Sequence, residues 1–265
     1  IFKMILDKIA DKTVERINKK KKDVSFDEIK EKAELLSSDT GFPFEKALKS
    51  DDMSFICEVK KASPSKGIIS EDFNPVEIAK EYEDAGASAI SVLTEPYYFM
   101  GEDSYIKNIV KNVSIPVLRK DFVVDSYMIY EAKILGASAV LLICAILDEI
   151  TLEKYIKIAK SLGLSPLVEA HSVEEIEMAV RSGANIIGVN NRDLKTFTVD
   201  ITNSIVLRPL VPQNILFVSE SGIKNREDIM VLRDNNVDGV LIGETLMTSS
   251  DKAVTLAYLK DKSVD

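Results

Sequence analysis

The chain contains the segments AGASAI at residues 85–90, LGASAV at residues 135–140 and SGANII at residues 182–187. In each segment a glycine follows an amphipathic stretch and precedes a run of apolar residues. The glycines recur about every 50 residues, and a degenerate fourth copy ends at Asp238-Gly239. A glycine in this position is typical of a helix end, and the apolar run after it is typical of a buried strand. The repeat therefore predicts a unit of two strands and two helices that occurs four times.

Short apolar runs alternate with amphipathic stretches from residue 54 onward. The runs lie at residues 55–57, 89–93, 116–118, 139–143, 166–168, 186–189, 215–218 and 239–242. Such alternation predicts βα units around a parallel sheet. Four copies of a two-strand unit close an eight-stranded barrel, whereas an open doubly wound sheet gives no reason for the repeat. The sequence therefore predicts the α/β class and a (β/α)8 TIM barrel with an N-terminal helical extension.

Helix starts are marked between the apolar runs. Asn74 precedes Pro75, which is the pattern of an N-cap followed by proline in the first helical position. Ser172 and Glu175 have the spacing of a capping box. These signals place helices where the βα units need them.

Residues 1–50 form the predicted helical extension, packed on a barrel that spans residues 51–265, with the whole chain as one domain. Apolar residues at positions 5, 6, 9 and 17 indicate one amphipathic helix. Ser25 and Glu28 mark the start of a second helix. The extension is long enough to cross one mouth of the barrel. Its sequence leaves open whether it closes the bottom or covers the mouth where ligands bind.

The composition argues against several classes of function. Among 265 residues, 34 are basic and 43 are acidic, and this net charge of −9 disfavours nucleic acid and anionic membranes as partners. Two cysteines and one histidine cannot supply a disulfide framework or the usual zinc sites. The apolar runs are too short for a membrane span. We therefore expect a cytoplasmic chain without a metal, in which Lys, Glu and Asp carry any acid–base chemistry.

Catalytic groups of a (β/α)8 barrel lie at the carboxyl ends of the strands and in the loops that follow. The residues at these places are Glu58, Lys60, Thr94, Glu95, Lys120, Cys144, Glu169, Asn190, Arg192, Ser219, Glu220, Ser221, Gly222 and Gly243. Because a barrel interior is apolar, ionisable groups at the strand ends must face the mouth or be paired. Lysines and glutamates that converge on one rim favour a catalytic site over a structural network.

Glycine-containing turns follow the last two predicted strands. They carry Ser221 with Gly222, and Gly243 with Glu244, where such barrels bind phosphate. Backbone N–H groups in these turns can hold a dianion without a lysine. Because Glu244 is acidic, we expect its side chain to point outward and only its backbone to contribute. The segment at residues 63–67 has hydroxyls and a lysine, and is typical of a mobile loop that closes over a charged ligand.

Together these segments resemble the indole-3-glycerol-phosphate synthase family of tryptophan biosynthesis. The resemblance rests on EVKKASPSKG (58–67), LTE (93–95) with Phe99, RKDF (119–122), LVEAH (167–171), GVNNRDL (188–194), SESGI (219–223) and IGETLM (242–247). It covers nearly the whole chain, including the extension. It implies an enzyme, a carbon–carbon lyase without a cofactor. The family closes the indole ring of 1-(2-carboxyphenylamino)-1-deoxyribulose 5-phosphate, forming indole-3-glycerol phosphate, CO2 and water.

The resemblance implies a set of catalytic residues. They are Lys120, Glu169, Glu58, Lys60, Asn190 and Glu220. By resemblance, Lys120 is the general acid that protonates the ribulose carbonyl, and Glu169 serves the proton transfers that expel water. Glu58 and Lys60 are a further acid–base and positioning pair. Asn190 and Glu220 orient the polar groups of the substrate. The residues alone do not settle how Glu58, Lys60 and Glu169 divide these roles.

The resemblance also implies substrate-binding residues. They are Ser63, Phe99, Phe122, Arg192, Ser221, Gly222, Gly243 and Glu244. Arg192 is the implied partner of the substrate carboxylate, and the two phenylalanines flank its aromatic ring. Lys60, Lys120 and Arg192 supply local positive charge for a phosphorylated substrate. We expect neighbouring cations to lower the pKa of Lys120 towards neutrality, which suits a general acid.

Two alternatives compete with this function. One is another phosphate-binding barrel, such as the isomerase that precedes the synthase in its pathway, but it gives no reason for the segments 58–60 and 63–65. The other is a non-catalytic barrel that binds sugar phosphates. Loss of catalysis should remove Lys120 or Glu169 first, and both are present. The chain departs from some family members in carrying Ala62 in place of a lysine and Glu244 in place of a serine.

Overall fold

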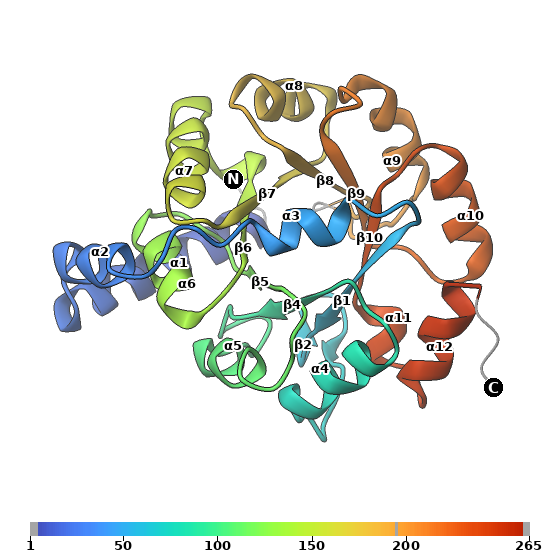
Figure 1. Ribbon diagram of the computed structural model, residues 1–265, viewed down its shortest axis with the longest axis horizontal. Helices are drawn as coiled ribbons and strands as arrows, with labels where there is room; N and C mark the ends of the chain where they lie inside the picture. The colour runs from blue at the N-terminus through green and yellow to red at the C-terminus, as the bar shows by residue number, and fades with distance from the viewer. Residues whose placement is uncertain (1–4, 194–195, 262–265) are drawn as a thin grey trace.

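The computed structural model describes residues 5–193 and 196–261, so Leu194 at the end of the segment 188–194 lies outside them. Its centre is a closed barrel of parallel strands surrounded by helices (Figure 1). The barrel strands are β1 Ser54–Val59, β4 Ala89–Leu93, β5 Val117–Lys120, β6 Ala139–Ile143, β7 Ser165–Ala170, β8 Ile186–Asn190, β9 Leu216–Glu220 and β10 Gly239–Ile242. They follow one another around the barrel in chain order, and the pairing of β1 with β10 and β4 closes it. The predicted TIM barrel is confirmed.

Helices connect successive strands and cover the outside of the barrel. They are α4 Pro75–Asp84, α5 Asp103–Ile109, α6 Tyr127–Leu135, η1 Cys144–Ile146, α7 Glu149–Ser161, α8 Val173–Arg181, α9 Thr202–Leu207, η2 Arg208–Leu210, α10 Arg226–Asp234, α11 Glu244–Met247 and α12 Lys252–Leu259. A short antiparallel hairpin, β2 Ala62–Ser63 with β3 Gly67–Ile68, lies in the loop after β1. Of the helices that the structure describes, none has the length and apolar character needed to cross a membrane.

The predicted helix starts are confirmed in all but one detail. The Asn74 side chain accepts the N–H groups of Val76 and Glu77, and caps α4. The Ser172 hydroxyl accepts the N–H of Glu175, as a capping box requires. The Glu175 carboxylate, however, accepts the N–H of His171, one residue before the cap. The reciprocal half of the predicted capping box is therefore wrong, because the carboxylate is used one residue upstream.

The strands bury side chains on both of their faces. One set, which includes Phe55, Cys57 and Val92, packs between the strands and the outer helices. The alternate set, which includes Ile56 and Leu118, fills the inside of the barrel. This follows from the two-residue period of a strand. The barrel is consequently a packed core, and a ligand can enter only at its ends.

The extension contacts both ends of the barrel. It contains α1 Ile5–Asp23, α2 Phe26–Glu34 and α3 Pro43–Leu48. From α3, Phe44 and Leu48 join the inner core, and Ser54 at the start of β1 donates a hydrogen bond to the carbonyl of Ala47. Figure 1 shows α3 lying across the barrel. From α1, the apolar residues at positions 5, 6 and 9 line the cavity at the opposite, carboxyl end. Thus α3 closes the bottom of the barrel, while α1 lies at the mouth where ligands are predicted to bind.

Ion pairs hold α1 on the barrel. The Arg16 guanidinium binds both carboxylate oxygens of Asp121, at 2.8 and 2.9 Å. One turn further along, the Lys20 ammonium lies 2.6 Å from Glu131, which also accepts a 2.7 Å bond from Arg119. Asp121 and Arg119 are buried. The helix is therefore fixed beside the end of β5, the strand that carries the predicted catalytic lysine.

Candidate active site

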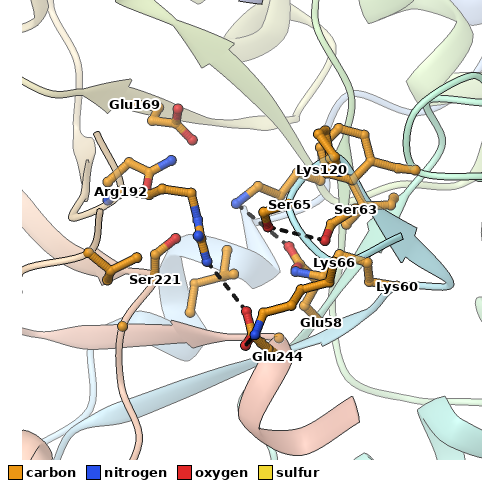
Figure 2. A pocket seen from close by; sticks show the side chains of 18 of the residues that line it. Glu58, Lys60, Ser63, Ser65, Lys66, Lys120, Glu169, Arg192, Ser221 and Glu244 are labelled. Carbon is orange, nitrogen blue, oxygen red and sulfur yellow. Dashed lines mark hydrogen bonds and ion pairs between the residues drawn. The ribbon is translucent and has the colours of Figure 1, made fainter. Parts of the chain in front are cut away.

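A cavity of about 580 Å³ lies at the carboxyl end of the barrel. Its lining includes these predicted site residues: Glu58, Lys60, Ser63, Phe99, Lys120, Phe122, Glu169, Asn190, Arg192, Ser221, Gly222, Gly243 and Glu244. Glu220, the remaining predicted residue, is buried and contacts Lys120. Figure 2 shows eight of these side chains converging from different strands and loops: Glu58, Lys60, Ser63, Lys120, Glu169, Arg192, Ser221 and Glu244. The structure thus brings the whole predicted set together at one end of the barrel.

The cavity contains a cluster of charged side chains, in which Glu58 and Glu220 are buried and Lys60 and Lys120 are partly buried. The Lys120 ammonium lies 2.5 Å from Glu220 Oε2 and 3.7 Å from Glu58 Oε2. The other oxygen of Glu58 accepts a hydrogen bond from Lys60. Three different strands or the loops after them supply these residues, so only the closed barrel brings them together. Among the described residues, no group of three or more His, Cys, Asp or Glu is placed to hold a metal ion.

The carboxylates raise the pKa of Lys120. Burial alone would lower the pKa of this lysine, but Glu220, Glu58 and Glu169 outweigh burial and hold it above its ordinary value. The expectation that cations lower the pKa of Lys120 towards neutrality is therefore wrong, because the charges closest to its ammonium are negative. Lys120 holds its proton at neutral pH in this arrangement.

The two carboxylates beside Lys120 shift in opposite directions. Burial raises the pKa of Glu220 to about 7, with a further contribution from Glu169 and with Lys120 opposing it. Burial also acts to raise the pKa of Glu58, but Lys60 and Lys120 outweigh it and lower this pKa below its ordinary value. At neutral pH Glu58 is therefore ionised, and Glu220 takes up a proton more readily than Glu58 does.

Two glycines leave room for these carboxylates. A Cβ at Gly188 would lie 2.2 Å from Glu220 Oε1, and a Cβ at Gly243 would lie 2.3 Å from Glu58 Oε1 and 2.8 Å from Lys60 Nζ. Gly188 is not among the residues predicted for the site, and Gly243 is predicted for phosphate binding alone. A signal for Gly188 exists, since glycine inside a strand marks a place where another group approaches closely. Both glycines are needed by the charged cluster.

The side chain of Glu244 faces the cavity. Figure 2 shows its carboxylate between Lys66 and Arg192. Its Oε1 lies 3.0 Å from Lys66 Nζ, and its Oε2 lies 3.4 Å from Arg192 Nη2. The expectation that this side chain points outward is wrong, because two cations from other loops attract it. Arg192, predicted to bind the substrate carboxylate, thus lies at the end of the cavity predicted for phosphate.

The turn after β9 has an unusual backbone. Ser221 and Gly222 have positive φ angles of 68° and 86°. A positive φ is uncommon for any residue but glycine, so Ser221 is held there by its surroundings. A Cβ at Gly222 would also come within 2.4 Å of Val199. The turn is therefore tightly packed, and its backbone conformation is specified by glycine.

Aromatic and apolar side chains also line the cavity. The rings of Phe99 and Phe122 lie 5.9 Å apart with an interplanar angle of 34°. Ile5, Leu6 and Ile9 of α1 also line the cavity, although they are not among the predicted site residues. Their helical spacing predicts a buried face, but nothing in that pattern identifies the end of the barrel that they cover. Ser63 lies in the hairpin after β1, on the cavity's rim.

His171 links Glu169 to the outer surface. Its Nε2 lies 3.4 Å from Glu169 Oε1, and its Nδ1 lies 3.2 Å from Glu175 Oε2. Burial acts to lower the pKa of His171, but its hydrogen bond to the Glu175 carboxylate and the charges of Glu169 and Glu175 outweigh burial and raise this pKa. His171 therefore contacts Glu169, which lines the cavity, without lining the cavity itself.

Four other candidates at strand ends do not line the cavity: Thr94, Ser219, Glu95 and Cys144. The buried Glu95 carboxylate accepts the N–H groups of Tyr97, Tyr98 and Phe99 at 2.7 to 3.1 Å. Cys144 is buried and donates to the carbonyl of Glu175. The side chains of Glu95 and Cys144 therefore shape loops beside the site. Position at a strand end identifies a candidate, but the side chain can still turn away from the mouth.

Comparison with known proteins places the chain in a family. The family model described as indole-3-glycerol phosphate synthase matches residues 6–259. A protein of that name from Ruminiclostridium cellulolyticum is 60% identical over 257 residues, which cover 97% of this chain and 99% of the relative. Another, from Endomicrobium trichonymphae, is 55% identical over 258 residues, which cover 97% and 100%.

Among solved structures, 3-hexulose-6-phosphate synthase from Salmonella typhimurium has a TM-score of 0.65 over 79% of this chain and 97% of its own. Its sequence is 16% identical, so this likeness concerns the fold alone. The family model and the close relatives, by contrast, cover nearly the full chain. The chain belongs to the indole-3-glycerol phosphate synthase family.

Proposed function

We propose that the chain converts 1-(2-carboxyphenylamino)-1-deoxyribulose 5-phosphate to indole-3-glycerol phosphate, CO2 and water. The observation that carries this proposal is the largely enclosed ammonium of Lys120, which lines the cavity and contacts Glu220 and Glu58. A charged lysine in an enclosed site is a proton donor beside any carbonyl that binds there. The family of the chain performs ring closure at such a carbonyl.

The two ends of the cavity match the two ends of this substrate. Lys60, Lys66 and Arg192 lie toward one end, where a phosphate dianion would be attracted. Phe99 and Phe122 lie beside each other in the lining, where an aromatic ring would pack. The volume of about 580 Å³ is within the range of small-molecule sites, roughly 300–1,000 Å³. The substrate would therefore span the cavity with its carbonyl near the central lysine.

Ring closure is the step that we assign to Lys120. The aromatic carbon that carries the carboxylate attacks the ketone carbon, and Lys120 gives its proton to the ketone oxygen, which becomes a hydroxyl. Positioned proton transfer of this kind contributes ~10²–10⁴-fold to the rate. Holding the two reacting carbons together adds a further large factor. Glu220 and Glu58 keep Lys120 protonated and hold its ammonium in position until it donates the proton.

Decarboxylation follows from the same intermediate. The carboxylate leaves as CO2, and the electron pair of the broken bond restores the aromatic ring. The ring itself receives these electrons, so the step needs no additional electron acceptor. Apolar walls at this end favour loss of the charged group, since they solvate a carboxylate poorly.

Dehydration is the step that we assign to Glu169. The new hydroxyl leaves as water when the Glu169 carboxyl gives it a proton. The Glu169 carboxylate that remains then accepts the proton lost from the CH2 carbon next to the ring nitrogen, which forms the double bond of the indole. Figure 2 shows Glu169 apart from the Lys120–Glu58 pair, on the other side of the cavity. We therefore assign this step to Glu169 and not to Glu58, which is ionised between two lysines and positions Lys60 and Lys120. We propose that Asn190 and Glu220 orient the hydroxyl groups of the substrate.

Product formation can be observed directly because the chain has no tryptophan. Mixing the purified chain with the synthetic substrate should produce indole fluorescence above a background of tyrosine alone. Heat-denatured protein is the matched control. Absence of new fluorescence from the folded chain would contradict the proposed synthase activity and favour a non-catalytic barrel. A phosphate-binding barrel that only isomerises its substrate would likewise form no indole.

A further inference from the structure

The Glu244 carboxylate joins two loops across the mouth of the cavity. Lys66 belongs to the loop after β1, and Arg192 belongs to the loop after β8. Each binds a different oxygen of Glu244, at 3.0 and 3.4 Å. The three side chains are partly exposed, at 55%, 37% and 23% for Lys66, Glu244 and Arg192. The bridge is therefore accessible to a ligand that enters from solvent.

Positive charge surrounds this one carboxylate. Burial acts to raise the pKa of Glu244, but Lys66, Arg192 and Lys60 outweigh it and lower the pKa. The side chain is consequently an anion at neutral pH. The cations that it neutralises are those that would attract a negatively charged ligand to this end of the cavity.

We propose that Glu244 is an internal anion that the phosphate of the substrate must displace from Lys66 and Arg192. This inference rests on the proposed function, because it assigns the phosphate to this end of the site. A dianion beside a carboxylate at contact distance is strongly repelled. The bridge and the phosphate therefore exclude each other on the same two cations. Glu244 is then a determinant of affinity, since every binding event has to break its two ion pairs.

The competing role for Glu244 is to hold its two cations in place for the ligand. The two roles predict opposite effects when the charge is removed. If the carboxylate competes, a neutral side chain of the same shape should strengthen phosphate binding. If it only positions Lys66 and Arg192, the same change should weaken binding, because the long side chains would lose their order.

The first experiment titrates inorganic phosphate into the full chain by calorimetry. We expect Glu244→Gln to bind phosphate about three- to tenfold more tightly than the unaltered chain, which is the range for two partly exposed ion pairs. The control Glu153→Gln removes one charge from an exposed ion pair on α7, so it corrects for net charge. It should leave phosphate affinity unchanged. Equal or weaker binding by Glu244→Gln would overturn the proposal, as would failure of the chain to bind phosphate.

A double-mutant cycle tests whether the competition acts through Lys66. Lys66→Ala should cost more phosphate affinity in the Glu244→Gln chain than in the unaltered chain, because only there is the lysine unneutralised before binding. Equal losses in both chains would overturn the proposal. These titrations need no turnover. If they give the expected result while no indole forms from the substrate, the internal anion stands and the proposed function fails.

Discussion

Replacement of Gly188 by alanine tests how the central charge cluster is held in place. A Cβ at this position in β8 would lie 2.2 Å from Glu220 Oε1. Ordinary contact begins near 3.4 Å, so the carboxylate would have to move by about 1 Å or more. Gly188 is not among the described residues with positive φ, so its backbone accepts alanine without strain. The perturbation is therefore steric and is aimed at one carboxylate.

The size of the effect follows from the burial of Glu220. Its side chain is 1% exposed and lies 2.5 Å from Lys120, so it cannot move into solvent without leaving the lysine. Misplacement of a catalytic group by about 1 Å can cost ~10²-fold in rate. Overpacking a core costs about 1–3 kcal/mol, which for a chain of this size lowers Tm by roughly 3–10 °C. We expect kcat to fall about 10²-fold in a chain that still folds.

The assay is kcat from indole fluorescence, together with Tm from circular dichroism. Gly239→Ala is the matched control, because this glycine lies at the start of β10, where the nearest atom to a Cβ is 3.3 Å away. Its kcat should remain near that of the unaltered chain. In a Glu220→Ala background, Gly188→Ala should cost little more, since the clash requires the carboxylate. Normal turnover by Gly188→Ala, or the same loss in both backgrounds, would refute the reasoning.

Three further predictions concern single residues. Lys120→Ala should bind substrate but turn over at least ~10²-fold more slowly, as single-turnover kinetics would measure; near-normal turnover would show that another group is the acid. The pKa of His171 is raised in the folded chain despite its burial. The charged histidine therefore stabilises the fold below the unfolded pKa of about 6.5, and this stabilisation is lost as the pH rises through the folded pKa. His171→Gln should therefore lower Tm more at about pH 5 than at about pH 9, and an equal loss at both would contradict this. Arg16→Met removes the cation that binds both oxygens of the buried Asp121 and leaves Arg119 at 3.7 Å, so it should destabilise the chain by about 1.5–3 kcal/mol. We expect a single transition, because we propose that residues 1–50 and 51–265 form one domain, and a separate early transition would argue for two.

Sequence alone was sufficient for the barrel because its signals are local. The glycine before each strand and the apolar run after it depend only on neighbouring residues, and their repetition fixed the number of units. The same logic located the site, since strand ends of a closed barrel share one rim. Cys144 and Glu95 show the limit of this rule, because both lie at strand ends yet turn into the surrounding loops.

Properties that depend on distant neighbours could not be predicted in this way. The side-chain direction of Glu244 is set by Lys66 and Arg192, which are far away in the sequence. The pKa of Lys120 is raised because carboxylates from other strands, rather than cations, lie closest to it. The extension divides between both ends of the barrel, which an amphipathic pattern cannot reveal. A cytoplasmic location and the absence of nucleic-acid partners stay predictions.

Ring closure with loss of the carboxyl group is the chemistry on which every assignment in the cavity depends. The most direct measurement supplies substrate labelled with carbon-13 in its carboxylate and quantifies labelled CO2 and indole-3-glycerol phosphate in the same reaction. Equal amounts of the two products, formed by the unaltered chain and reduced together in Lys120→Ala, are the predicted result. Labelled CO2 without the indole product, or indole product that retains the label, would contradict it.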